Sequence, residues 1–315
     1  MSNIKGFAYG IATSVTFGLI PLFTLPLMAK GMLFDSILFY RFLFATAALL
    51  ILTLVKKESL RISRRDIPFL LLLGLLYTLS AMFLFWGYSF MSAGIATTLH
   101  FTYPVFVTLV MLVFFHEKTS WVTVVAILLA ISGVARLSIQ SGDEQIDAFG
   151  LVIVLLSAVA YALYITTVNK ARIRTLTGRT LTFYVFIVST LLFALKAGLH
   201  TGIQPIPDAA SWLNLLLLAV VPTVISNITL VLAVHHIGGT LTAVLGATEP
   251  VTAVLVGVVV FGEPFTAHLA LGIVLIILAV TMIILSKHIR HNLNTLMRHL
   301  KREYVRRVSK TEHRR

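Results

Sequence analysis

The sequence predicts an all-α integral membrane protein, with ten transmembrane helices arranged as two inverted five-helix repeats. Three observations lead to this prediction: an apolar composition, an internal repeat and an uneven distribution of Lys and Arg. Hydrophobic residues make up 58% of the 315 residues, charged residues make up 12%, and the mean hydropathy is +0.96. Soluble domains carry about twice that share of charged residues. We therefore expect the chain to be embedded in a membrane.

Ten apolar runs are interpreted as membrane spans, for each of which about 20 residues are needed. They are Ile4–Ala29, Ser36–Val55, Ile67–Phe90, Ala93–Phe115, Ser120–Ile139, Phe149–Val168, Thr180–Leu195, Trp212–Val234, Thr240–Phe261 and Ala267–Leu285. The first run superficially resembles a signal peptide. It is longer than the apolar core of about 7–15 residues that a cleavable signal has, so we expect an uncleaved span.

The fourth and ninth runs carry the same motif. The segment from Pro104 to Glu117 matches the segment from Pro250 to Glu263 at 7 of 14 positions, with a constant offset of 146 residues. Both prolines and both glutamates are among the matches. The chain therefore contains an internal repeat.

The repeat divides the chain into four parts. These are a first five-helix repeat (1–139), an outer linker (140–147), a second five-helix repeat (148–286) and a basic amphipathic tail (287–315). Because five spans are an odd number, the second repeat enters the membrane from the side opposite to the first. The two repeats are therefore predicted to be inverted.

Lys and Arg collect on one side of this predicted topology. With the N-terminus inside, 21 of the 25 Lys and Arg fall in the inner segments, ten of them in the tail. Since cytoplasmic segments are enriched in these residues, we expect both termini to be cytoplasmic and the membrane to be a bacterial inner membrane. The chain has no cysteine, which excludes disulfides and cysteine-based metal sites.

Two five-helix halves that each carry Pro followed thirteen residues later by Glu resemble the EamA domains of the drug/metabolite transporter superfamily. The resemblance covers about residues 4–286 and includes Tyr40-Arg41-Phe42 and Met91-Ser-Ala-Gly94. It implies export of amino acids or related metabolites, with YddG-like exporters of aromatic amino acids as the nearest structurally understood relatives.

The two prolines predict a binding site independently of this resemblance. Pro104 and Pro250 cannot donate to the carbonyl four residues earlier, so the carbonyls of His100 and Gly246 are expected to lose their helical partner near mid-span. A freed carbonyl at this depth must be buried in protein or face a wet cavity. Broken helices at matching places in inverted halves indicate a transporter binding site, although a kink could also merely shape helix packing.

Glu249 and Arg41 are charges predicted inside the membrane. A carboxylate near the bilayer centre costs about 2.5–3.5 kcal/mol or more, so Glu249 should face inward. There it could neutralise an amine, accept a proton or pair with Arg41, and a structural hydrogen bond at the kink is the alternative. Arg41 could bind substrate or extend to the membrane interface.

Further candidates for substrate contact are polar or aromatic side chains expected near the same cavity. They are His100, Tyr103, Tyr77, Ser80, Trp86, Asn227, Thr248 and Tyr161. The alternatives are hydrogen bonds between helices for the polar residues, and packing or an interfacial position for the aromatic residues. Glu117 and Glu263 are expected to cap the fifth and tenth spans rather than bind substrate.

The predicted function is secondary export of small organic metabolites by alternating access. The family resemblance implies amino acids, including aromatic ones, as the substrates. The chain lacks Gly-x-Ser-x-Gly, His-Glu-x-x-His and Walker motifs, so neither an enzyme nor a cofactor or metal is expected. A channel or scaffold, or a lipid-modifying enzyme that uses Glu249 and His100, are the alternatives. We expect a monomer whose tail contacts anionic lipids and that does not bind nucleic acid.

Overall fold

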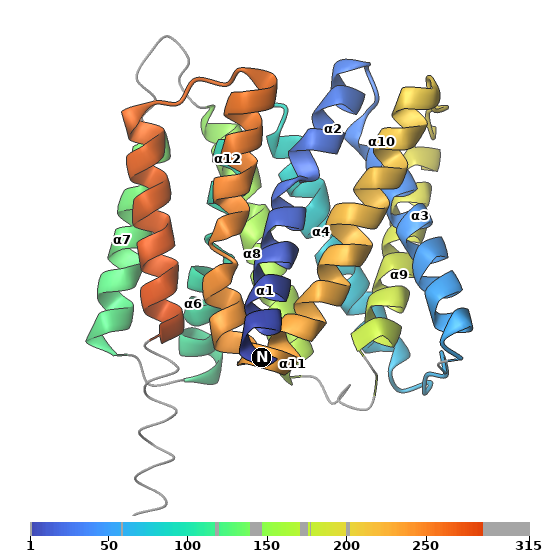
Figure 1. The fold of residues 1–315 in the computed structure, drawn as a ribbon, viewed down its shortest axis with the longest axis horizontal. Coiled ribbons are helices and arrows are strands. Elements are labelled where there is room, and N and C mark those ends of the chain that lie inside the picture. The colour runs from blue at the N-terminus through green and yellow to red at the C-terminus, as the bar shows by residue number, and fades with distance from the viewer. Residues whose placement is uncertain are drawn as a thin grey trace, which may run out of the picture.

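The structure is a computed structural model that describes residues 2–57, 59–116, 120–138, 147–170, 176, 178–199 and 202–285. These residues form helices and short connections, and no strand occurs among them. The helices stand side by side, and the N-terminus lies at the lower edge of the bundle (Figure 1). The linker up to residue 146, the basic tail (287–315) and Glu117 lie outside the described residues.

The helices follow one another along the chain with short connections. They are α1 (Ser2–Gly18), α2 (Ile20–Ala29), α3 (Phe34–Val55), α4 (Ile67–Gly87), α5 (Ala93–His100), α6 (Tyr103–Phe115), α7 (Trp121–Ser138), α8 (Ala148–Lys170), α9 (Gly178–Leu199), α10 (Ala209–Ala219), the π-helix η1 (Val220–Ile225), α11 (Ser226–Leu245), α12 (Thr248–Phe261) and a last, unlabelled helix (Ala267–Leu285). We call the end of the bundle that holds the N-terminus the N-terminal face.

Eight segments of the described chain are long and apolar enough to cross a membrane, and two shorter apolar helices accompany them. The eight segments coincide with predicted spans, which confirms the prediction of a helical membrane protein. The shorter helices are Trp121–Leu137 and Thr248–Phe261, and they fall within the fifth and ninth predicted spans. The ninth predicted span is not one continuous helix. Helix α11 continues to Leu245, and a turn at Gly246–Ala247 separates it from α12.

The two predicted helix breaks are present. The chain leaves the helix at Phe101–Thr102 before Pro104, and at Gly246–Ala247 before Pro250. The Gly246 carbonyl was expected to be left without a hydrogen-bond partner, and this detail is wrong. The N–H of Glu249 donates a hydrogen bond to it at 3.0 Å. The turn tightens from a four-residue to a three-residue spacing, and this carbonyl is satisfied within its own segment.

Two further interruptions were not predicted. The first span is divided at Leu19 into α1 and α2, with Pro21 near the start of α2, and the eighth span contains η1 around Pro222. Proline removes a backbone donor, and π-helical turns insert one extra residue into a helix, frequently at functional sites. Both prolines were visible in the sequence, yet the apolar runs around them were interpreted as uninterrupted.

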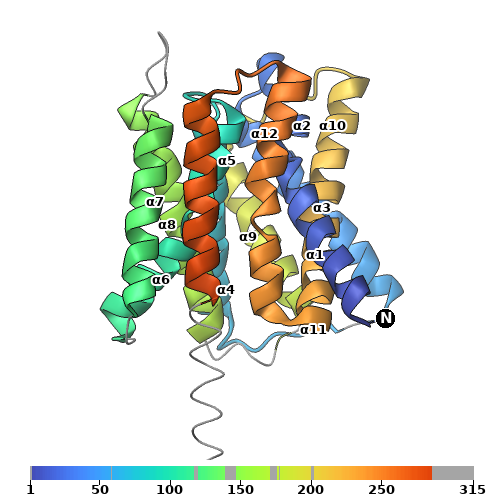
Figure 2. The ribbon, with the colours of Figure 1, turned by 60° about the vertical axis from the view of Figure 1, so that its left-hand side comes forward.

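Helix α1 packs closely against α11 and α12, and α4 packs against α8 and α9; Figure 2 shows α1 beside α11 and α12 from a second side. Gly18, at the end of α1, makes the close approach to α12 possible. A Cβ at this position would lie 2.5 Å from the Thr252 Cβ and 2.6 Å from the carbonyl oxygen of Glu249. The backbone that carries Glu249 therefore rests directly on α1.

Polar contacts join the α2–α3 and α9–α10 connections at the face opposite the N-terminus. Lys30 Nζ lies 2.7 Å from Asp208 Oδ2, and it holds the pKa of the Asp208 carboxyl at about 2. The side-chain oxygen of Gln204 accepts from the Leu33 N–H at 2.6 Å, and the Gln204 N–H donates to Ser36 Oγ at 3.0 Å. This face is therefore tied together by segments about 170 residues apart in sequence.

Glu263 lies between α12 and the last helix, and it caps a helix other than the predicted one. Its Oε1 accepts a hydrogen bond from the N–H of Ala93, the first residue of α5, at 3.1 Å. The carboxylate is thus placed at the positive end of the α5 dipole. The expectation that Glu263 caps the tenth span is wrong, because the last helix is capped by Thr266, whose Oγ1 accepts from the Leu269 N–H at 3.1 Å.

We predict that Glu263→Ala lowers the free energy of unfolding by about 0.5–2 kcal/mol, as the loss of an N-terminal cap does. Glu263→Gln, which keeps an acceptor oxygen but removes the charge, should fall between Ala and the unchanged chain. Melting temperatures of the purified protein in detergent measure both effects. Equal melting temperatures for all three proteins would contradict the cap.

We also predict that Gly18→Ala destabilises the protein by about 1–3 kcal/mol, since overpacking against backbone cannot be relieved by a side-chain rotation. The matched control is Gly198→Ala on α9, where an added Cβ meets nothing within 4 Å. Thermal melting of the two variants in the same detergent compares them. A melting temperature for Gly18→Ala at or above that of the control would refute the close contact.

Candidate functional site

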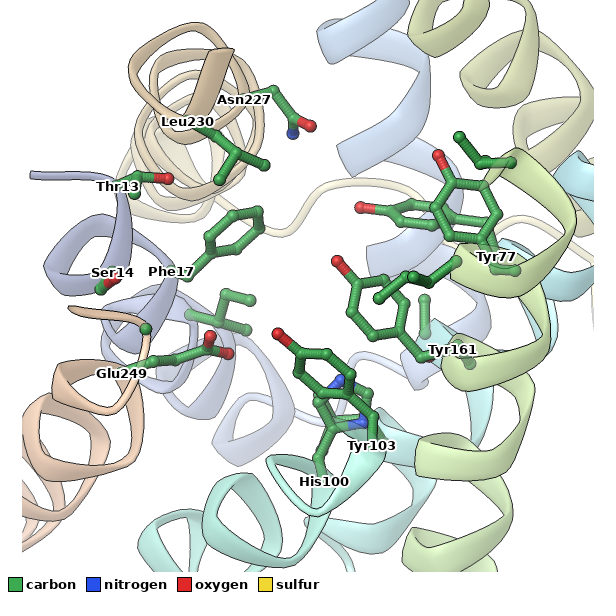
Figure 3. A pocket seen from close by; sticks show the side chains of 18 of the residues that line it. Thr13, Ser14, Phe17, Tyr77, His100, Tyr103, Tyr161, Asn227, Leu230 and Glu249 are labelled. Carbon is green, nitrogen blue, oxygen red and sulfur yellow. The ribbon is translucent and has the colours of Figure 1, made fainter. Parts of the chain in front are cut away.

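A cavity of about 340 Å³ lies between the two sets of packed helices. Residues of α1, α2, α3, α4, α5, α6, α8, α11 and α12 contribute to its lining. In Figure 3, Phe17, Asn227, Leu230 and Glu249 line one side, and Tyr77, Tyr103, Tyr161 and His100 line the other. The lining includes Val168 and Val234, which lie toward the N-terminal-face ends of α8 and α11, and it extends past the middle of the bundle to Phe85.

One side of the cavity is a continuous aromatic surface, which we call the tyrosine wall (Tyr77, Tyr103, Tyr161 and Tyr164). The ring centroids of Tyr103 and Tyr161 are 4.7 Å apart and the rings meet edge to face, while Tyr161 and Tyr164 stack at 5.8 Å. Tyr77 contacts Tyr164 at 5.2 Å. Aromatic pairs at these separations stabilise one another by about 0.5–1.5 kcal/mol, so the wall is a preorganised surface.

The hydroxyl groups of the tyrosine wall make no hydrogen bond within the described part of the protein. Each hydroxyl is one donor and an acceptor. In Figure 3 the hydroxyls of Tyr103 and Tyr161 point into the cavity. The wall therefore combines apolar ring surface with polar groups available to a solute.

Glu249 faces this wall from the start of α12. Figure 3 shows its carboxylate directed into the cavity, on the side facing Tyr103. Among the described residues, no cation and no side-chain donor is bonded to it. Within the described part of the chain, this carboxylate therefore does not form the structural hydrogen bond at the helix break that was the alternative considered from the sequence.

His100 ends α5 and is held by a residue that the sequence did not point to. Its Nδ1 lies 2.6 Å from the hydroxyl oxygen of Ser157 on α8, and its ring packs against Tyr161 at 5.4 Å. Ser157 is fully buried. This hydrogen bond orients the imidazole against the tyrosine wall. It depends on the packing of α5 against α8, which the sequence alone does not show.

The Arg41 side chain does not reach the surface of the helix bundle. Its side chain is 3% exposed, its Nε donates to Thr223 Oγ1 at 2.9 Å, and its guanidinium carbon lies 5.5 Å from the ring centroids of both Phe42 and Phe85. Arg41 lines the cavity. Among the described lining residues Arg41 is the one Lys or Arg, and it is buried near the end of the cavity that lies away from the N-terminal face.

Eight of the predicted contact residues line the cavity. They are Arg41, Tyr77, Ser80, His100, Tyr103, Tyr161, Asn227 and Glu249. Thr248 lies outside the lining, and its hydroxyl donates to the Leu245 carbonyl at 2.8 Å. Trp86 also lies outside it, because it packs on Phe34 and Phe149.

The sequence reasoning placed the first span at the cavity but named none of its lining residues. Thr13, Ser14 and Phe17 of α1 and Ile20 of α2 line the cavity. The interruption after Gly18 was the available signal, since broken helices border transporter sites. Within the described ranges, no group of three or more His, Cys, Asp or Glu is arranged to hold a metal ion.

Comparison with solved structures supports the fold. One crystal structure superimposes with a TM-score of 0.62, covering 89% of this chain and 95% of the other at 18% sequence identity. At this identity the likeness concerns the fold alone.

Three proteins named as uncharacterized transporters are similar in sequence. A protein of Synechocystis is 25% identical over 218 residues, which are 67% of this chain and 64% of that relative, so the match spans slightly less than two thirds of its length. A protein of Archaeoglobus fulgidus is 24% identical and covers 71% of this chain and 80% of its own. YdfC of Bacillus subtilis is 24% identical, with 76% and 78% covered.

The profile of the EamA-like transporter family matches the chain twice, over residues 4–139 and 148–285. The two matches together cover most of the sequence, and they include the helices that line the cavity. The chain belongs to the EamA-like transporter family.

Proposed function

We propose that this protein is a secondary transporter that exports small organic metabolites of the amino acid class by alternating access. The observation that carries the proposal is the cavity, which is bordered by broken helices from both halves of the chain. In this proposal the chain spans the membrane ten times, as two inverted five-helix repeats (1–139 and 148–286). Inverted repeats with discontinuous helices at a central site are typical of secondary transporters.

The size and chemistry of the cavity suit a small solute with charged and apolar parts. A volume of about 340 Å³ lies at the lower end of the range of about 300–1,000 Å³ for ligand sites. Glu249 offers a counter-charge for an amine, Arg41 a counter-charge for an acid, and the tyrosine wall a surface for an apolar or aromatic side chain. An amino acid carries all three groups.

The proposed cycle moves α1, α11 and α12 relative to α4, α8 and α9. We infer that the N-terminal face is cytoplasmic, because Lys56, Lys57 and Arg61 follow α3 there, and that the structure corresponds to a state loaded from this face. At the opposite face α5 and α12 are joined by the bond between Glu263 and Ala93. Release to the outside would require these two helices to separate.

The proposal places the protein in a bacterial inner membrane, acting as a monomer. The tail (287–315) would lie on the anionic cytoplasmic leaflet, since clusters of Lys and Arg next to a membrane span are attracted by acidic lipids. No cofactor is required, because transport of this kind depends on a gradient of the solute or of protons.

We expect the purified protein in liposomes to accelerate the movement of at least one labelled amino acid above the rate in empty vesicles. A panel of aliphatic, aromatic and acidic amino acids, each measured with and without a pH gradient, tests this. Since proton exchange would make flux depend on the gradient, the same experiment separates it from facilitated diffusion. Flux equal to that of empty vesicles for every member would favour a channel, a scaffold or an enzyme.

We predict that Glu249→Gln abolishes any dependence of flux on the pH gradient, because an amide cannot release a proton. The matched control is Asp147→Asn, which removes an exposed carboxylate outside the cavity and keeps an acceptor oxygen for the Phe149 N–H. Flux of the amino acid identified above, measured at several internal pH values, reports the result. Unchanged flux and unchanged pH dependence in Glu249→Gln would remove this carboxylate from the mechanism.

A further inference from the structure

Arg41 is a buried cation without a counter-ion. In the described chain its one hydrogen bond is the one from Nε to Thr223 Oγ1, and no carboxylate forms an ion pair with it. A guanidinium carries five N–H donors, so its terminal amino groups remain available on the cavity side. A charge buried in this way is costly unless it is paired.

Thr223 fixes the direction of this guanidinium. The Thr223 hydroxyl donates its only proton to the Leu218 carbonyl at 2.9 Å, so its oxygen can only accept from Arg41. This bond spans five residues and lies in the π-helical region η1, where the extra residue of the wider turn opens space for the hydroxyl. The rings of Phe42 and Phe85 are additional contacts of the guanidinium.

Other charged or titratable side chains of the cavity do not neutralise Arg41. Glu249 belongs to α12 and makes no ion pair with it. His100 is bonded to Ser157, and the tyrosine hydroxyls are neutral at ordinary pH. Among the described residues that line the cavity, none supplies an anion to Arg41, so this position is open to an anionic group of a solute.

We propose that Arg41, oriented by Thr223, binds the carboxylate of the transported solute and makes the cavity selective for carboxylates. The planar fork of a guanidinium matches the two oxygens of a carboxylate, which gives short charge-assisted bonds. Thr223 is a positioning residue, because it acts on the solute only through Arg41. This inference rests on the proposed function and specifies which part of the solute is recognised.

The test compares phenylalanine with phenylalaninamide, which has the same ring and amine but no carboxylate, and with 3-phenylpropionate, which has the carboxylate but no amine. Each compound is titrated into the purified full-length protein in detergent, and the rise in melting temperature gives its apparent Kd. We expect the two carboxylates to bind at least about tenfold more tightly than the amide, which is the size of a charge-assisted hydrogen bond.

Arg41→Gln should remove this preference and weaken carboxylate binding about ten- to a hundredfold. Thr223→Val keeps the cation but removes its acceptor, so the preference should decrease while binding of the amide stays constant. Thr229→Val on α11 is the matched control, since that half-buried hydroxyl bonds only to carbonyls of its own helix turn and lies outside the cavity lining. Should Arg41→Gln not fold, Thr223→Val carries the test.

Equal binding of amide and carboxylate by the unchanged protein, or an equal loss for all three compounds in Thr223→Val, would overturn the inference. These outcomes are independent of flux. Carboxylate-selective binding without transport in liposomes would refute the proposed function and leave the anion site in place, whereas transport of phenylalanine and phenylalaninamide at equal rates would refute the anion site alone.

Discussion

The structure depends on one constraint, which is that lipid offers no hydrogen bonds to a polypeptide backbone. A helix in the membrane can break only where the freed groups are satisfied by protein or by a wet cavity. The interruptions at Leu19, at Phe101–Thr102, at η1 and at Gly246–Ala247 all lie in helices that border the cavity. The helix breaks therefore occur where the cavity is, because backbone groups freed by a break would be left without hydrogen-bond partners in lipid.

Close packing by small residues brings these broken segments together. Helices in lipid associate largely through van der Waals contact, and small residues at their interfaces let backbones approach. Gly10 of α1 lies against Leu245, and Gly18 lies against the Glu249 backbone. The position of the Glu249 carboxylate consequently depends on residues more than 200 positions earlier in the chain.

The two buried charges of the cavity have different surroundings. Arg41 is held by Thr223 and by two aromatic rings, so its orientation is set before any solute enters. Glu249 is without a partner among the described residues and faces a wall of tyrosines. The two charges lie on different groups of helices. This arrangement suits a site in which the fixed cation binds the acidic end of a solute and the unpaired carboxylate binds its amine or a proton.

The sequence by itself determined the membrane class, the positions of most spans and the breaks before Pro104 and Pro250, because hydropathy and proline geometry act over a few residues. Only the tertiary structure decided that Thr223 holds Arg41, that Ser157 holds His100, that Glu263 caps α5 and that Trp86 lies outside the cavity. Membrane helices are apolar on every side, so their sequence does not reveal which face is buried. Which helices become neighbours depends on packing between distant segments.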